Sequence, residues 1–249
     1  MQQFSNTSVR CLVSSVLVAG VLSLPNAVLA QETDFTDEYD ECQDIGERED
    51  PWERTNRKIF RFNDTVDRWT LKPLAQGYKK VTPDAVERGI HNVFRNLGET
   101  TNLANNLLQF KLHDAGVDTA RFLFNTTFGV LGIFDVATKM GLQRSDEDFG
   151  QTLGAWGVKS GPYVVLPLLG PSTVRDGLAI YPDSYVSSFR YINDVPVRNS
   201  AMGLNLVDVR ANLLSKERFI TGDKYRFVRN AFLQNREFKV RDGNVVDDF

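Results

Sequence analysis

The sequence contains few of the residues that most catalytic sites use. Among 249 residues there are two cysteines and two histidines, His91 and His113. No serine lies in a G-x-S-x-G elbow, and neither H-E-x-x-H nor paired C-x-x-C motifs occur, so a hydrolase triad and a zinc site lack suitable residues. The glycines at 150, 154 and 157 do not form a dinucleotide-binding pattern. We therefore expect no enzymatic activity, no catalytic residue, no metal and no cofactor.

Long apolar runs are also missing. The stretch Leu12–Leu24 is apolar apart from its serines but has only 13 residues, short of the roughly 20 that a membrane-spanning helix needs. It follows Arg10 and precedes Val28-Leu29-Ala30, which is the pattern of a secretory signal cleaved after Ala30. We expect residues 1–30 to be a signal peptide and the remainder to be exported.

Cysteine is too scarce for a disulfide framework. Cys11 would leave with the signal peptide, so Cys42 would have no intramolecular partner. Neither cysteine follows the small-residue box that precedes a lipidated cysteine, so the sequence predicts no lipidation site.

Charge is unevenly distributed along the chain. Residues 31–50 carry ten acidic residues and one basic residue, Arg48, and without these and Arg10 there remain 22 acidic and 27 basic residues. We expect residues 31–50 to be a disordered acidic segment, residues 51–243 to form the folded domain, and residues 244–249 to be a tail. A net charge of about +5 on the body suits an anionic lipid surface and is too small to indicate nucleic-acid binding.

The folded part shows helical periodicity. Thr82-Pro83-Asp84 predicts a helix start, and Thr173 with Asp176 forms a capping-box pattern that predicts another. Apolar residues then recur at helical spacing at Val86, Ile90, Val93, Phe94 and Leu97, at Val117, Ala120, Phe124, Phe128 and Leu131, and within Pro196–Leu214 and Asp223–Phe238. A short helix is expected near Asp135. No segment after residue 30 alternates cleanly enough to predict a strand, so we expect an all-α domain without repeats.

Two segments are more apolar than surface helices usually are. One is Arg121–Ala137, interrupted by Gly129 and Gly132, and the other is Gly161–Pro171, which has no charged residue. Both are consistent with buried core elements. The competing interpretation is that they are broken helices that lie in one membrane leaflet, and the sequence leaves it open.

Several motifs carry a family resemblance. Residues 149–176 contain F-G-Q-T-L-G, G-P-Y-V-V-L-P and G-P-S-T-V-R-D in that order, and residues 50–57 read D-P-W-E-R-T-N-R. Together with Arg121-Phe122, Asn125-Thr126 and the segment from Asp223 to Arg236, they resemble the VacJ/MlaA family of outer-membrane phospholipid-transport proteins over about residues 50–243.

The resemblance implies a fold, a location and partners. It implies a single ring-like helical domain whose broken amphipathic helices lie in the periplasmic leaflet of the outer membrane around an amphipathic channel. Such a protein removes misplaced phospholipid from the outer leaflet and passes it to a periplasmic carrier, beside a trimeric porin. Family members are typically lipoproteins, which differs from the cleavage pattern of this chain.

The same two segments supply the candidate channel residues. Apolar side chains that could contact acyl chains are Phe124, Phe128, Leu131, Val164, Val165 and Leu168. Polar side chains that could contact a headgroup are Asn125, Thr127, Lys159, Ser160 and Tyr163. Two other interpretations remain: a scaffold that binds porins without passing lipid, and, more remotely, a weak lipid esterase.

Overall fold

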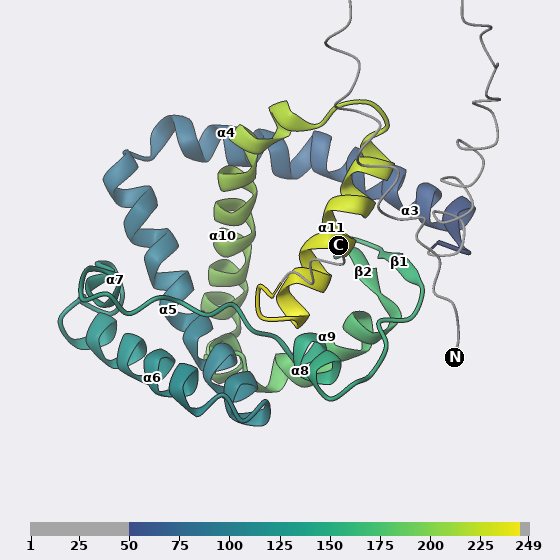
Figure 1. Ribbon diagram of the computed structural model, residues 1–249. Coiled ribbons are helices and arrows are strands. Elements are labelled where there is room, and N and C mark those ends of the chain that lie inside the picture. Colours follow the sequence, from purple (N-terminus) through teal and green to yellow (C-terminus); the bar gives the residue numbers. More distant parts are fainter. Residues whose placement is uncertain (1–49, 245–249) are drawn as a thin grey trace, which may run out of the picture. The chain divides into compact units, whose positions relative to one another are not determined.

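Helices account for most of the residues that the computed structural model describes, which are residues 50–244 (Figure 1). Trp52–Asn244 form one unit with its own packing. The expected signal peptide and cleavage site, nearly all of the acidic segment, and residues 245–249 of the tail lie outside the described residues.

The first three elements join into one continuous helical rod. They are α3 (Glu53–Val66), the π-helical segment η1 (Asp67–Leu71) and α4 (Lys72–Val81), and the backbone stays in the right-handed helical region at both junctions. Pro73 cannot donate a backbone hydrogen bond, and its ring would collide with the carbonyl of residue 69 in a regular α-helix. The wider π turn that precedes Pro73 accommodates this conflict.

A corner separates the rod from α5 (Asp84–Leu108). Thr82 is extended because the residue before a proline avoids the helical region. The predicted helix start is confirmed, but Pro83 occupies the N-cap position and no side chain caps the helix. Thr82 therefore ends one helix and does not cap the next.

Helix α6 (Leu112–Thr127) packs along α5 after a short turn. The helical periodicity predicted to continue to Leu131 stops at Thr127, because Val130 and Leu131 have positive φ angles of 54° and 58° and Gly132 follows at 93°. The expected short helix is α7 (Val136–Lys139), and the side chain of Asp135 caps it by accepting from Thr138 N.

The expectation that the folded part has no strand is wrong. After α8 (Phe149–Ala155), β1 (Tyr163–Leu166) and β2 (Gly170–Thr173) form an antiparallel hairpin in which Tyr163 pairs with Thr173. Strands of four residues are too short to show a clear alternation in the sequence.

Two asparagines on α3 complete the free edge of β1. Asn56 donates from Nδ2 to the Tyr163 carbonyl (3.0 Å) and accepts from the Val165 amide (2.9 Å). Asn63, two turns further along α3, donates to the Leu166 carbonyl (2.9 Å) and accepts from the Leu168 amide (2.8 Å). These side chains replace the neighbouring strand that the hairpin lacks, which is the tertiary contact that the sequence pattern could not reveal.

The remaining elements complete the unit. They are α9 (Val174–Val186), the 3₁₀ segment η2 (Ser188–Tyr191), α10 (Val195–Leu213), the 3₁₀ segment η3 (Leu214–Phe219) and α11 (Lys224–Val240). The predicted helix start at Thr173 is confirmed, since Thr173 Oγ1 accepts from Asp176 N at 3.2 Å, while the Asp176 carboxylate pairs with Arg175 and Arg236.

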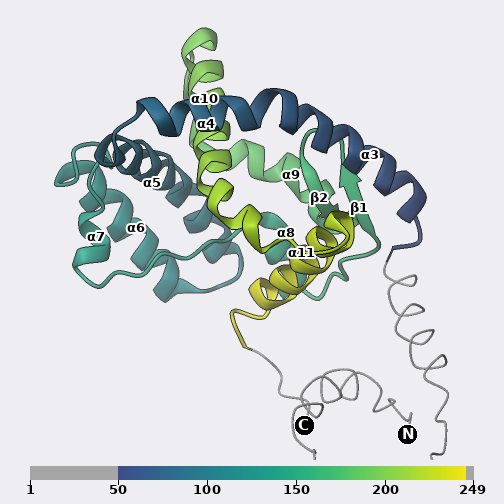
Figure 2. The same cartoon turned by 90° about the horizontal axis from the view of Figure 1, so that it is seen from above.

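The rod, α5, α6 and the hairpin follow one another around the unit, and β1 returns to pack on α3 (Figure 1). Helix α10 crosses and contacts α4, and α11 lies against α8 and β2 (Figure 2). The expected helical class is confirmed, with the hairpin as the exception. Among residues 50–244, no helix combines the length and apolar character that crossing a bilayer would require.

Candidate functional site

The folded unit buries polar side chains and exposes many large apolar ones. Its one hydrophobic cluster is built on Tyr163, Val165 and Tyr225, and the other fully buried apolar residues of the described part are alanines. Buried polar residues are far more numerous and include Glu99, Asp118 and Arg121. Water-soluble proteins usually show the opposite arrangement, and large exposed apolar areas mark interaction surfaces.

The most apolar exposed loop follows α6. Its exposed members are Phe128, Val130, Leu131, Ile133 and Phe134, with 70% of Phe128 and 70% of Leu131 accessible. Val130 and Leu131 adopt the left-handed conformation, which is costly for residues that are not glycine. Such strain persists only where the surrounding structure enforces it, and it is concentrated at functional positions.

The tip of the hairpin has the same two properties. Leu168 and Leu169 are 68% and 67% exposed, and Leu168 has a φ of 64°. Two of the predicted apolar contacts, Leu131 and Leu168, therefore lie on strained loops with accessible side chains.

The structure separates the predicted site residues into two groups. Phe124, Asn125, Thr127, Phe128 and Leu131 lie at the end of α6 and in the loop after it, and Lys159, Ser160, Tyr163, Val164, Val165 and Leu168 lie before and within the hairpin. These elements are on opposite sides of the folded unit in both views (Figures 1 and 2). The structure thus brings the members of each group together but does not place the groups in contact.

Within the first group, accessibility differs. The rings of Phe124 and Phe128 stack with centroids 5.9 Å apart, and Phe128 faces outward. Asn125 is buried and its amide is used within the fold, accepting from Ala137 N (2.9 Å) and donating to Asp135 (3.2 Å). Thr127 is exposed but donates to the Leu123 carbonyl.

In the second group, Tyr163 and Val165 face inward. Tyr163 is 1% exposed and packs its ring against Tyr225 and Phe232, with Val165 in the same cluster. Lys159 and Ser160 are exposed, Val164 is intermediate, and Leu168 is accessible. The predicted lipid contact of Tyr163 and Val165 stays a prediction, and their structural role is to hold the hairpin.

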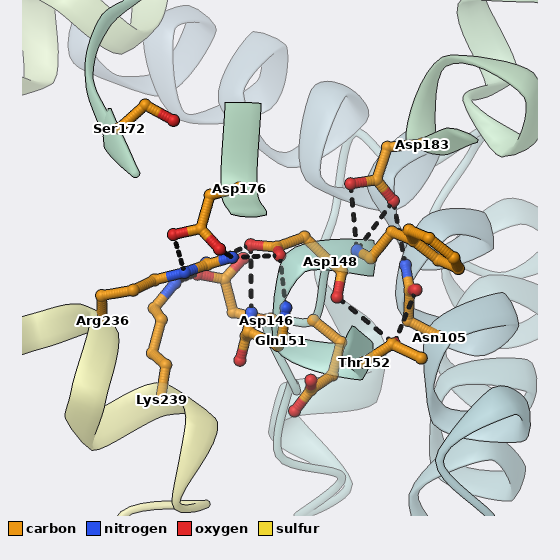
Figure 3. A network of polar contacts seen from close by, with 12 residues as sticks. Asn105, Asp146, Asp148, Gln151, Thr152, Ser172, Asp176, Asp183, Arg236 and Lys239 are labelled. Atoms are coloured by element: carbon orange, nitrogen blue, oxygen red, sulfur yellow. Dashed lines mark hydrogen bonds and ion pairs between the residues drawn. The ribbon is translucent and has the colours of Figure 1, made fainter. Parts of the chain in front are cut away.

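A network of ion pairs holds α8, α9 and α11 together (Figure 3). Arg236 on α11 donates to both carboxylate oxygens of Asp148 (2.5 and 2.6 Å) and to Asp176 at the start of α9 (3.0 Å). Burial alone would raise the pKa of Asp148, but the hydrogen bonds from Arg236 lower it below the ordinary value. Gly150 leaves room for this ion pair, because a Cβ there would lie 2.3 Å from Nη2 of Arg236.

The same network continues to α5 (Figure 3). Asp183 accepts from the Phe149 amide (3.0 Å) and from Asn105 Nδ2 (3.1 Å), and Asn105 accepts from Thr152 Oγ1 (2.9 Å). Burial raises the pKa of Asp183 in spite of these hydrogen bonds.

A second polar network joins α5, α6 and α7. Arg121 is 1% exposed and donates to Glu99 (2.9 Å), to the Leu142 carbonyl (2.6 Å) and to Asp135 (3.3 Å). Burial would raise the pKa of Asp135, but hydrogen bonds from Thr138 and the charge of Arg121 lower it to about 2. This network fixes the start of α7 and hence the end of the strained apolar loop.

Sequence reasoning missed this polar interior. On α5 the buried side chains include Asn96, Glu99, Asn102 and Asn106, spaced by three or four residues, and on α6 they include Asp118, Arg121 and Asn125. The spacing is helical and visible in the sequence. Buried helix faces are normally predicted from apolar residues, and here the apolar face of α5 includes the exposed Val86.

Comparison with known proteins places the chain in a family with named members. Residues 48–239 match the family described as MlaA lipoprotein. The chain is 33% identical over 213 residues to the intermembrane phospholipid transport system lipoprotein MlaA of Haemophilus influenzae, covering 83% of this chain and 85% of the relative. The MlaA lipoprotein of Escherichia coli K12 is 32% identical over 204 residues, covering 80% and 81%.

A solved structure agrees with the fold. It comes from work on the structural basis for maintenance of bacterial outer membrane lipid asymmetry, and it superposes with a TM-score of 0.68 at 31% sequence identity. The match covers 77% of this chain and 98% of the other. An uncharacterised protein of Rickettsia bellii is also similar, at 35% identity over 196 residues and 77% of each chain.

Proposed function

The chain belongs to the MlaA lipoprotein family, and on this basis we propose that it takes part in phospholipid transport at the outer membrane and so helps to maintain lipid asymmetry. The observation that supports the proposal most directly is the combination of family membership with an exposed apolar surface over a polar interior. Its role is that of a transport component, and no enzymatic step is assigned to it.

The surface explains how the chain would stay at a membrane without a spanning helix. Broken helices and loops can insert to the depth of one leaflet if their freed backbone groups are satisfied within the protein. The hairpin edge meets this condition, because Asn56 and Asn63 pair with the backbone of residues 163–168. Burial of apolar area at about 25 cal/mol per Å² would then hold the unit in the leaflet.

The finer part of the proposal is a conduit. The strained loop at residues 128–134 and the hairpin tip at residues 167–169 would contact acyl chains, while polar side chains next to these loops would contact the headgroup. Phospholipid misplaced in the outer leaflet would enter and leave toward a periplasmic carrier, with a trimeric porin beside the protein. Since the chain offers no nucleotide-binding motif, the direction of net movement would come from partners or from the lipid gradient.

The proposal is tested in cells that lack the endogenous gene and produce variants of this chain. Phe128→Asp and Leu168→Asp each place a charge on an exposed loop residue, and both should abolish transport, which is measured as phospholipid accessible at the cell surface to an added phospholipase. Phe219→Asp is the matched control, because Phe219 is 61% exposed and lies in η3, outside both loops. It should behave as wild type.

The alternative scaffold role gives a different result. If both loop variants restore low surface phospholipid as well as wild type does, the conduit assignment is wrong. If porin co-purification is lost while lipid distribution is unchanged, the scaffold interpretation replaces it.

A further inference from the structure

Arg95 stands out among the charged residues of the folded unit. It lies in α5, it is only partly exposed, and within residues 50–244 no ion pair or hydrogen bond is formed by its side chain. Other arginines with little exposed surface, such as Arg121, Arg210 and Arg236, each contact carboxylates. Removing a guanidinium from water without an ion-pair partner costs free energy, and binding an anion would offset that cost.

Arg144 lies beside Arg95. Gly98 is one turn after Arg95 on α5. A Cβ at Gly98 would be 3.0 Å from Nη2 of Arg144, so the guanidinium of Arg144 lies against α5 one turn from Arg95. The side chain of Arg144 is 20% exposed. Its Nε is buried without a hydrogen-bond partner among the described residues, although Glu99 Oε1 lies 3.4 Å away.

The carboxylates nearby pair with groups other than Arg95. Glu99 contacts both Arg121 (2.9 Å) and Arg144 (3.4 Å), and Asp135 is engaged with Thr138, Asn125 and Arg121. Asp146 is 3.8 Å from Arg144 and is itself exposed and paired with Lys239. Burial is the largest cause that lowers the pKa of Arg95 below its ordinary value; the positive charges of Arg144 and Arg121 act in the same direction, and Asp135 and Glu99 oppose them.

An apolar surface adjoins this cluster. Asn92, one turn before Arg95, donates to the Ile133 carbonyl at 3.0 Å, and the side chain of Ile133 packs over Gly89. The exposed loop 128–134 is thus fixed to α5 within about one helical turn of Arg95, a rise of roughly 5 Å. A cationic pair at the border of an apolar surface matches a molecule with an anionic head and apolar chains.

We propose that Arg95 and Arg144 together bind the phosphate of a phospholipid whose acyl chains lie on loop 128–134. Two guanidinium groups present several N–H donors to the phosphate oxygens, and they bind phosphate with better directionality than lysine does. The inference rests on the proposed function and deepens it, because it names the part of the fold that recognises the headgroup.

The test measures binding to the purified full-length protein in a non-ionic detergent. The probes are dihexanoyl phosphatidylglycerol, dihexanoylglycerol with the same chains and no phosphate, and inorganic phosphate. Arg95→Gln should weaken binding of the phosphatidylglycerol about tenfold, which is typical of one lost charge-assisted contact, and should leave dihexanoylglycerol binding unchanged. Arg88→Gln is the matched control, because Arg88 is an exposed arginine two turns earlier on the same helix, and it should bind as wild type.

A thermal unfolding midpoint separates binding from folding. Arg95→Gln removes a charge that is repelled by Arg144, so the midpoint should not fall. If Arg95→Gln binds phosphatidylglycerol as tightly as wild type, the proposal is overturned. Inorganic phosphate bound as tightly as the lipid also overturns it, because the site would then be a free-anion site.

These results are independent of the cellular transport test. If the wild-type chain does not restore transport in cells, the proposed function is contradicted, even if Arg95 binds the lipid in detergent. Normal transport with Arg95→Gln binding unchanged would contradict only the headgroup site.

Discussion

Arg236 on α11 donates two hydrogen bonds to Asp148, the residue that caps α8, with N–O distances of 2.5 and 2.6 Å. One side chain near the end of the described chain therefore fixes the helix that precedes the hairpin. The third donor contact, to Asp176, links the same arginine to the first turn of α9.

Arg236→Met is expected to lower the free energy of unfolding by about 3 kcal/mol, because it leaves the Asp148 carboxylate without its cationic partner and removes one of the two arginines that pair with the buried Asp176. Urea denaturation followed by circular dichroism measures this change. Arg226→Met is the control: its contact with Asp223 is exposed and 3.9 Å long, so the cost should stay below about 1 kcal/mol. Equal costs for the two variants would show that the Arg236 network does not hold the fold.

The lowered pKa of Asp135 predicts that the stability of the protein depends on pH. Its pKa is about 2 in the folded state, below the ordinary value of 3.8, so its contribution is complete above pH 4 and is lost as the pH falls through 2. Asp135→Asn should therefore cost about 2 kcal/mol at pH 7, and the difference from wild type should shrink between pH 4 and pH 2. Denaturation curves across this range provide the measurement, and a cost that is independent of pH would contradict the assignment.

Two glycines near α6 should respond oppositely to alanine. Gly132 has a φ of 93° and a Cβ there would lie 2.7 Å from Asn96 Cβ, so Gly132→Ala should destabilise the protein by about 1–3 kcal/mol. Gly116 lies inside α6 with open space around it, so Gly116→Ala should stabilise it by about 0.5–1 kcal/mol. Thermal unfolding of both variants tests this, and a neutral Gly132→Ala would mean that the loop tolerates a different backbone conformation.

Val165 and Leu168 are three residues apart in the hairpin and should differ sharply in their tolerance of charge. Val165 is 2% exposed in the aromatic cluster, so Val165→Asp should cost at least about 3 kcal/mol and reduce the amount of folded protein. Leu168 is mostly exposed, and aspartate tolerates its positive φ, so Leu168→Asp should change stability by less than about 1 kcal/mol. Limited proteolysis compares the two, and resistance of Val165→Asp equal to wild type would place Val165 on an accessible surface.

Helix boundaries were predictable where local chemistry sets them. Pro83 and Asp84 start α5, Asp135 caps α7 and Thr173 caps α9, and each of these depends on residues within four positions of each other. The hairpin was not predictable, because its exposed edge is satisfied by Asn56 and Asn63 from more than 100 residues earlier in the chain.

The sequence by itself determined the helical class, the family and the two apolar segments, because periodicity, caps and ordered motifs are properties of neighbouring residues. Only the tertiary structure decided which side chains are accessible. It placed Phe128 and Leu168 on strained exposed loops, and it buried Tyr163 and Val165 as packing residues. It also placed Arg95 near Arg144, and in the described part of the chain Arg95 forms no ion pair with a carboxylate. Burial and charge pairing depend on segments that meet only after folding, and spacing along the chain does not specify them.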